Sequence, residues 1–341
     1  GAAAAAGIAA KDWLAARGGP GTIKFFGAPA EEGGGGKVYM VRAGLFRDVD
    51  VAITWHPGDA NRVTRSTSLA NVTAKFRFRG VSAHAAAAPE QGRSALDGVE
   101  AMNAMVNLMR EHVPSETRIH YVITNGGGAP NVVPDFAEAY YYARHSDMRV
   151  LDGIWERIRN AAKGAALGTG TQVEEEVVNA VYNTLPNDAL ADVMQRALDR
   201  VGGFAYTPEE ERFAAALRPT LAGAAALAGS QEKVSPPHTG VASISTDVGD
   251  VSWVVPTVQL MAAVWVPGTP AHSWQAVAAG GMSIGTKGMM VAAKAMALTA
   301  VELLATPSEI AKAKAEFATR VGDFRYASKV GDRKPPLDYR K

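Results

Sequence analysis

The chain has 341 residues, which is enough for one large domain or two of ordinary size. Hydrophobic residues make up 47% and charged residues 20%, and the formal net charge is +1, so the composition is that of a globular protein. This near-neutral balance, with no basic stripe, argues against nucleic acid as a partner. Cysteine is absent, which excludes disulfides within these residues and leaves histidine and carboxylate side chains to hold any metal ion.

The first 67 residues alternate between helical and extended patterns, as in an α/β layer. The pattern predicts an alanine-rich helix at 1–17, a strand at 22–27, a helix near 37–43 and an apolar strand at 49–55. The chain starts with Gly and runs directly into the first helix without a preceding strand. We therefore interpret residues 1–67 as the first part of an α/β domain that appears truncated at its N-terminus.

The pattern changes near residue 68, where apolar and polar residues alternate with period two. The predicted elements that follow are a strand at 71–80, a helix at 94–113, strands at 118–124 and 136–145, a helix at 150–165 and a strand at 172–182. Their order, β-α-β-β-α-β, is the ferredoxin-like pattern. Residues 68–183 are therefore predicted to form an inserted domain.

The α/β pattern returns over residues 184–341, the predicted second part of the first domain. Helices are predicted at 188–201 and 208–217, a strand at 255–264, and further helices up to the C-terminus. The apolar stretch Met289 to Leu304 is interrupted by charged residues and is short for a bilayer, so it is interpreted as a buried helix and no membrane association is predicted.

Glu31 and Glu32 follow the predicted strand at 22–27, where an α/β sheet places its functional loops. Adjacent side chains leave the backbone in different directions. One carboxylate could therefore bind a metal ion while the other faces a metal-bound water, as a general base requires. Two acids at a helix N-terminus are explained equally well by the helix dipole.

His56 and His272 also come just after predicted strands, at 49–55 and 255–264. A single histidine at such a place is more often a capping or packing residue than a ligand. Together with a glutamate, two histidines suit Zn²⁺, Mn²⁺ or Co²⁺ by ligand type. The glycine run 33–36 lacks the Gly-Lys-Ser/Thr ending of a phosphate loop, so we expect it to allow close backbone approach to the site and not to bind a nucleotide.

Six motifs, in this order and spacing, resemble those of the M20 amidohydrolases. They are GAPAEEGGGGK at 27–37, WHP at 55–57, GVSAHA at 80–85, NVVP at 131–134, STDVGDVSW at 245–253 and GTPAHS at 268–273. The match covers essentially the whole chain and is most similar to the branch that contains the B-type chain of p-aminobenzoyl-glutamate hydrolase. The resemblance implies an α/β, zinc-peptidase-like catalytic domain with an inserted ferredoxin-like lid and dimerisation domain.

The resemblance also implies roles for single residues in catalysis and metal binding. Glu31 would be the general base and proton shuttle, and Glu32, His56 and His272 would be ligands of two divalent metal ions, zinc or manganese. His84 would reach the active site across a dimer interface and stabilise the developing oxyanion, although the sequence alone indicates only a surface histidine after a strand.

Two further residues are implied in substrate binding. Asn131 would hold the substrate or its carboxylate, and Arg144 is a second candidate for the same task. The segment 245–253 is expected to line the pocket, with no role assigned to Asp250 or Trp253, and Asp247 is equally well explained as a structural cap.

The resemblance predicts a cytoplasmic, metal-dependent amidohydrolase that cleaves the amide bond of N-acyl amino acids, with p-aminobenzoyl-glutamate-like substrates favoured. It would act as a homodimer or as a heterodimer with a related subunit. Family members carry a Cys-Gly-His segment with further metal ligands immediately before the point where this sequence starts. Its absence from these residues leaves an alternative open, a catalytically incomplete subunit or binding protein that retains the M20 fold.

Overall fold

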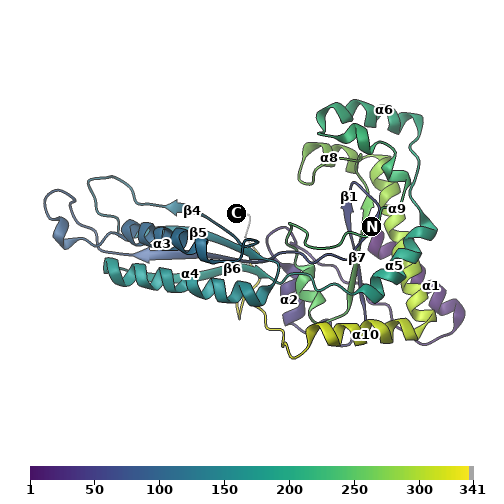
Figure 1. Cartoon of the computed structure of the whole chain (residues 1–341), viewed down its shortest axis with the longest axis horizontal. Helices are drawn as coiled ribbons and strands as arrows, with labels where there is room; N and C mark the ends of the chain where they lie inside the picture. Colours follow the sequence, from purple (N-terminus) through teal and green to yellow (C-terminus); the bar gives the residue numbers. More distant parts are fainter. Residues whose placement is uncertain (338–341) are drawn as a thin grey trace.

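The computed structural model describes residues 1–337 and contains two separate β-sheets, each covered by helices (Figure 1). The predicted domain part 184–341 therefore extends into residues 338–341, which lie outside the described chain. The smaller sheet has the order β1-β7-β2. Strand β1 (Ala52–Gly58) runs parallel to the central β7 (Thr257–Ala263), and the short β2 (Arg62–Thr64) pairs antiparallel with the other edge of β7.

Long helices pack around this three-stranded sheet. They are α1 (Ala2–Arg17), α5 (Asp188–Val201), α9 (Ser283–Ala305) and α10 (Pro307–Val321). Leu260 of β7, Met194 of α5 and Met296 of α9 lie in one hydrophobic core. By length and composition α9 could cross a membrane, but it packs against α1, α5 and β7 and contributes side chains to this core.

Shorter helices lie in the connections. They are α2 (Gly36–Arg42), α6 (Pro208–Leu217), α7 (Val248–Ser252) and α8 (Trp274–Gly280). Single 3-10 turns occur at Pro89–Gln91, Arg110–His112, Arg218–Thr220, Ala224–Leu227 and Ser230–Glu232. Helix α6 begins with a capping box, in which the Thr207 hydroxyl accepts from the Glu210 N–H and the Glu210 carboxylate accepts from the Thr207 N–H.

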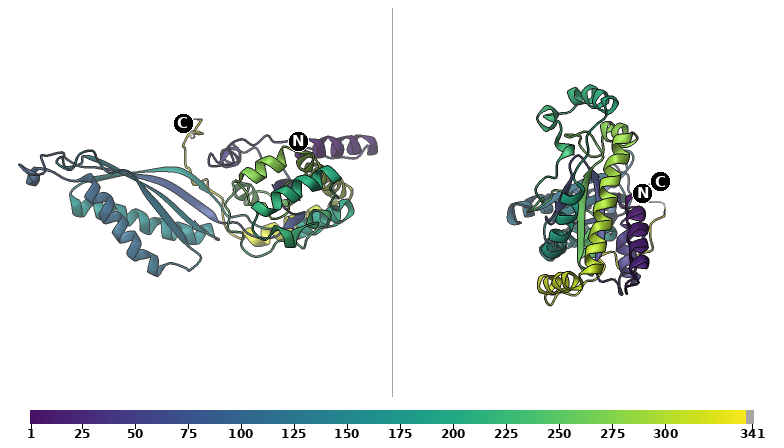
Figure 2. Two further views of the ribbon diagram at one scale, coloured as in Figure 1. Left: turned by 90° about the horizontal axis from the view of Figure 1, so that it is seen from above. Right: turned by 90° about the vertical axis from the view of Figure 1, so that its right-hand side faces the viewer.

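Residues 70–181 form an elongated unit around a four-stranded antiparallel sheet, which projects from the rest of the molecule (Figure 1). The strands are β3 (Ala70–Arg79), β4 (Arg118–Asn125), β5 (Phe136–His145) and β6 (Gln172–Val181), in the order β4-β5-β3-β6. Helices α3 (Ala95–Met109) and α4 (Met148–Thr169) lie on the same face of this sheet (Figure 2).

Period-two alternation determines the two faces of the four-stranded sheet. On β5, Ala139, Tyr141 and Ala143 are fully buried under the helices, whereas Tyr140 and Tyr142 between them point to the opposite face. That opposite face carries charged and polar side chains and no helix (Figure 2). It is therefore available to the segments of the chain that lie beside it.

Two predictions about the smaller sheet were wrong. Residues 22–27 form no strand, because an extended segment becomes a strand only when a neighbour pairs with it, and no described residue does so. His56 lies within β1 and not after it, since β1 continues through Pro57 to Gly58 and pairs along its length with β7.

Helix α7 holds the place where the chain leaves the four-stranded unit. The fully buried Asp250 carboxylate accepts hydrogen bonds from the Tyr182 N–H at 3.0 Å and the Tyr326 hydroxyl at 2.7 Å. The Trp253 indole N–H donates to the Asn183 carbonyl at 2.8 Å. These contacts join the end of β6 and the C-terminal segment to the α7 region.

Replacement of Asp250 by Asn should change how stability depends on pH. Burial raises the pKa of Asp250 to about 7, well above the unfolded value of roughly 3.9. Between these values the folded state binds more protons than the unfolded state, so the free energy of unfolding falls as the pH rises. We expect the stability of the wild type relative to Asp250→Asn to fall by about 2 kcal/mol between pH 5 and pH 8 in urea unfolding. The exposed Asp12→Asn is the control, and a pH-independent difference would contradict the assignment.

Candidate active site

A tight turn that precedes α2 positions Glu31 and Glu32. The Gly33 N–H donates to the Glu31 carbonyl at 2.7 Å, and the Gly34 N–H donates to the Ala30 carbonyl at 2.9 Å. Glycine is required where the turn meets α2, because a Cβ on Gly36 would lie 2.0 Å from the Pro29 carbonyl oxygen. The predicted role of the glycine run in close backbone approach fits this geometry.

A buried ion pair holds the end of this turn. Lys37 Nζ lies 2.7 Å from Asp247 Oδ1, and the Lys37 backbone N–H donates to Asp247 Oδ2 at 2.9 Å. The Asp247 side chain is completely inaccessible to solvent. Asp247 therefore fixes the start of α2, which is the structural role that the sequence left open for it.

The turn brings Glu32 next to His272, although the two residues are far apart in the sequence. His272 Nε2 lies 3.8 Å from Glu32 Oε2, and both side chains are largely exposed. Ala30 and His272 are the two non-glycine residues among residues 1–337 with a positive φ, at 59° and 58°. Such strained backbone persists only where the surrounding structure enforces it, and it is concentrated at functional sites.

His56 lies half-buried on β1. Its Nδ1 is 2.6 Å from the Pro57 carbonyl oxygen, which can only accept a hydrogen bond, so Nδ1 carries the proton and the lone pair is on Nε2. Metal-binding histidines are commonly held in this way, with the second ring nitrogen donating to a carbonyl. The tautomer of His56 therefore suits a ligand.

The metal site implied by the resemblance is not complete in these residues. Glu32 and His272 come together, but residues 1–337 contain no group of three or more His, Asp or Glu side chains that could hold a metal ion. His56 thus does not join the other two in a closed ligand set. The residues present do not by themselves fit a bound metal ion.

His84 and Asn131 lie next to each other in the loops at the far end of the four-stranded unit (Figure 1). The Ala85 N–H donates to the Asn131 carbonyl at 2.9 Å, and His84 pairs with Val132 in a short β-bridge. His84 Nδ1 accepts from the Ala86 and Ala87 N–H groups at 3.2 and 3.1 Å. The neutral ring therefore carries its proton on Nε2 and can donate it outward from an exposed side chain.

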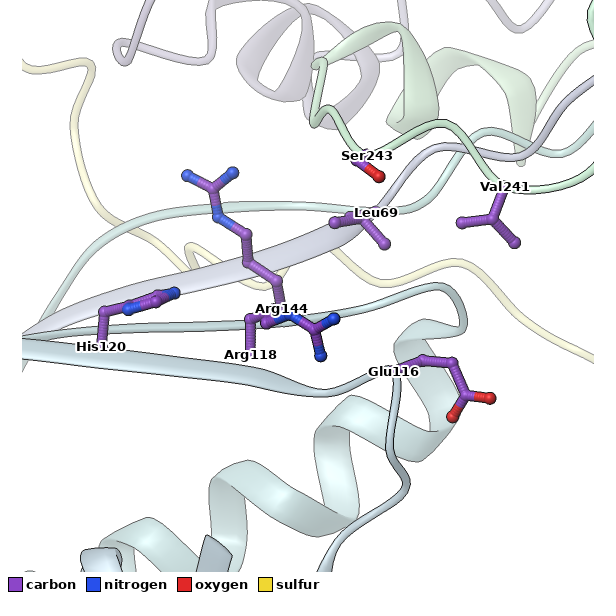
Figure 3. A pocket seen from close by; sticks show the side chains of 7 residues that line it. All are labelled: Leu69, Glu116, Arg118, His120, Arg144, Val241 and Ser243. Carbon is purple, nitrogen blue, oxygen red and sulfur yellow. The ribbon is translucent and has the colours of Figure 1, made fainter.

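Arg144 lies at the opposite end of β5 from Asn131, so the two predicted substrate-binding residues do not meet within one chain. Arg144 instead lines a pocket of about 660 Å³ between the four-stranded unit and the segment after Gly240 (Figure 3). The lining residues are Leu69, Glu116, Arg118, His120, Arg144, Val241 and Ser243. Sequence reasoning missed Arg118 and His120, which the period-two pattern of β4 places on one face but does not place opposite Arg144.

Known proteins share this architecture and these motifs. Residues 70–169 match the M20 dimer family model, described as a peptidase dimerisation domain. The B-type chain of the Escherichia coli K12 p-aminobenzoyl-glutamate hydrolase is 41% identical over 312 residues, which cover 84% of this chain and 65% of the relative. The Xaa-Arg dipeptidase of Mus musculus is 30% identical and covers 76% of this chain and 54% of the relative.

The crystal structure of the aminobenzoyl-glutamate utilization protein from Klebsiella pneumoniae shares the fold. Its TM-score is 0.61 at 22% identity, with 87% of this chain and 66% of that chain covered. The mixed α/β fold is thus that of M20 peptidase structures. Together the matches confirm the resemblance to M20 amidohydrolases that the motifs carry. The chain spans less than two thirds of the length of each of these relatives.

Removal of the Lys37 ammonium should destabilise the protein strongly. Lys37→Met leaves the buried Asp247 carboxylate without its counter-charge, and breaking such a pair costs about 3–5 kcal/mol. Urea unfolding measures the loss. The matched control is Lys24→Met, which removes a cation from the exposed pair with Asp48 and should leave stability nearly unchanged. Equal effects of the two substitutions would show that the Asp247 contact is not special.

Proposed function

We propose that this chain is part of a metal-dependent amidohydrolase that cleaves the amide bond of N-acyl amino acids, with p-aminobenzoyl-glutamate-like substrates favoured. The observation that carries the proposal is the approach of His272 to Glu32 between two strained turns. Its strongest support from known proteins is the 41% identity to a chain named as part of a p-aminobenzoyl-glutamate hydrolase.

The proposed domain boundaries follow the two sheets. Residues 1–67 and 184–341 form the catalytic domain, and residues 68–183 form an inserted ferredoxin-like lid and dimerisation domain. The strand order β4-β5-β3-β6 with two helices on one face supports the ferredoxin-like topology. The match of residues 70–169 to a dimerisation domain supports the second assignment.

Glu31 is the proposed general base. Its carboxylate is only partly buried, on a rigid turn beside Glu32, so it can take a proton from an attacking water and return it to the leaving nitrogen. Glu32, His56 and His272 are the proposed metal ligands, and two divalent ions, zinc or manganese, are the loading that the resemblance implies. The described residues supply too few ligands in one place, so the proposal requires further ligands from elsewhere in the complete protein.

The proposed partner is a second subunit, either an identical copy or a related chain. The relatives include two proteins named as different chains, A-type and B-type, of p-aminobenzoyl-glutamate hydrolase. Strand β4 is an edge of the four-stranded sheet, with Val122 57% and Ile123 44% exposed, and Leu108 on the adjacent α3 is 71% exposed. An open strand edge beside apolar side chains is a ready surface for pairing with another chain.

Across such an interface His84 would act on the substrate of the other subunit. Its Nε2–H would donate to the oxyanion that forms on the amide carbonyl, and Asn131 beside it would bind the substrate. Arg144 would bind the substrate carboxylate. The substrate is a small molecule, with no nucleic acid or membrane partner, and the proposed location is the cytoplasm.

A second candidate is a catalytically incomplete subunit or binding protein that retains the M20 fold. The absence of a three-ligand group within residues 1–337 favours it. Metal analysis followed by an amidase assay with added Mn²⁺ or Zn²⁺ separates the two. Turnover that depends on the metal supports the enzyme, whereas binding of an N-acyl amino acid without turnover in the complete protein supports the binding protein.

Replacement of Glu31 by Gln should abolish most of the hydrolysis. The substitution keeps the shape of the side chain but removes the proton acceptor, and we expect kcat to fall by about 10²-fold or more. The measurement is release of glutamate from p-aminobenzoyl-glutamate by the complete enzyme with saturating metal. The control is Glu209→Gln, an exposed acid on α6, which should retain wild-type turnover. Near-normal kcat in Glu31→Gln would overturn the assignment.

A charge on the β4 edge should weaken the dimer. Val122→Lys puts an ammonium group into the proposed interface, and we expect the dissociation constant to rise at least about tenfold. Sedimentation equilibrium measures this constant. The matched control is Leu167→Lys on α4, where an equally apolar and 86% exposed side chain lies away from the edge strand. A monomeric wild type, or an equal effect of the control, would contradict the proposed surface.

A further inference from the structure

The pocket that contains Arg144 holds more positive charge than one carboxylate needs. Arg118 on β4 lies directly opposite Arg144 on β5 in the antiparallel register. Directly opposite residues extend to the same face with Cβ atoms about 5 Å apart, and like charges in that arrangement are destabilising. His120 follows on the same face of β4 and lines the same pocket (Figure 3).

Neither guanidinium is neutralised within the described chain. Among residues 1–337 no carboxylate lies within 4 Å of Arg118 or Arg144, although most arginines of the four-stranded unit have such a partner. Arg118 Nη1 donates to the Ser115 and Thr117 carbonyls at 2.7 and 2.9 Å, which holds the group in place and leaves its other nitrogens available. Two fixed, unpaired guanidinium groups on one face are suited to an anion with two acidic groups.

One acid of the chain competes for this place. Glu116 lines the pocket on the Arg118 side, and its pKa is lowered, chiefly by hydrogen bonds from its own backbone and the Ser115 hydroxyl, with a smaller contribution from the charge of Arg118. Glu116 is therefore ionised at neutral pH. Because its side chain is exposed, a ligand carboxylate can replace it beside Arg118 without a cost from burial.

The pocket and the Glu31–Glu32 turn lie over the same face of the four-stranded sheet. Pairing carries one row of residues across that face, from His120 through Tyr142 and Thr73 to Asn179. A Cβ on Gly35, at the end of the turn, would lie 2.6 Å from Asn179 Oδ1. Because neighbouring strands are about 4.8 Å apart, β5 lies roughly 10 Å from β6 and hence from the turn. A ligand of the size of an N-acyl amino acid can extend over that distance.

We propose that this pocket binds the amino-acid part of the substrate and selects acidic amino acids, with Arg144 taking the α-carboxylate and Arg118, assisted by His120, taking the side-chain carboxylate. The proposal rests on the proposed function and adds its substrate class, an N-acyl dicarboxylic amino acid. Leu69 and Val241 line the same pocket and supply apolar surface for the methylene groups between the two carboxylates.

Calorimetric binding to the metal-free chain tests the pocket without any need for catalysis. The probes are N-acetyl-L-glutamate and N-acetyl-L-glutamine, which have nearly the same shape and differ by one negative charge. The wild type should bind the glutamate compound about ten times more tightly, and the difference should shrink with added salt. Equal affinity for the two probes would overturn the proposal and requires no variant.

Substitutions assign the two subsites. Arg118→Gln should reduce the preference for N-acetyl-L-glutamate to less than about twofold while binding of N-acetyl-L-glutamine stays unchanged, and Arg144→Gln should weaken both probes about tenfold. Glu116→Gln should strengthen glutamate binding, because the competing acid is gone. Arg212→Gln, an exposed arginine on α6, is the control. Equal loss of both probes in Arg118→Gln would contradict the second subsite, and thermal melts check that each variant folds.

Kinetics of the complete enzyme keep this proposal distinct from the proposed function. Hydrolysis with equal kcat/KM for N-acyl glutamate and N-acyl glutamine would overturn the pocket and leave the amidohydrolase standing. Absence of hydrolysis, together with a wild type that still prefers the glutamate probe, would overturn the enzyme and leave the pocket standing.

Discussion

The buried contact between Asp247 and Lys37 determines the geometry on which the rest of the site depends. A carboxylate removed from water is costly unless a counter-charge and hydrogen bonds compensate it, and Lys37 supplies both through its ammonium group and its backbone N–H. This contact fixes the start of α2 and with it the Glu31–Glu32 turn. Helix α7, which follows Asp247, also carries Asp250 and so holds the end of β6. One short helix thus links the turn to the root of the four-stranded unit.

Local pattern predicted the four-stranded unit well because its strands have one face under helices and one face in solvent. The predicted strand at 136–145 coincides with β5, and its alternation of buried and exposed residues is the signal that was used. The predicted strand at 22–27 has a similar composition but forms none, since strand formation depends on a partner that local sequence does not reveal. Pattern therefore reports the preference of a segment, and pairing decides the outcome.

The candidate site was predictable only where a motif carries chemistry by residue type. Glu32 and His272 stand in separate motifs, and the structure brings them within 3.8 Å. Arg118 and His120 belong to no motif, and charged residues on an edge strand usually face solvent. Their importance depends on the register of β4 against β5, which places Arg118 opposite Arg144. Register is a tertiary property, because a shift of one residue would turn these side chains to the other face.

The length of β5 constrains how the proposed substrate contacts can work together. Asn131 and His84 lie beyond one end of this strand and Arg144 near the other, and ten residues of strand span about 30 Å. An N-acyl amino acid is far shorter, so one chain cannot offer both ends to the same molecule. If both ends serve one substrate, His84 and Asn131 must come from a second subunit. Dimerisation is then a requirement of the chemistry and not only a source of stability, which connects the open edge of β4 directly to catalysis.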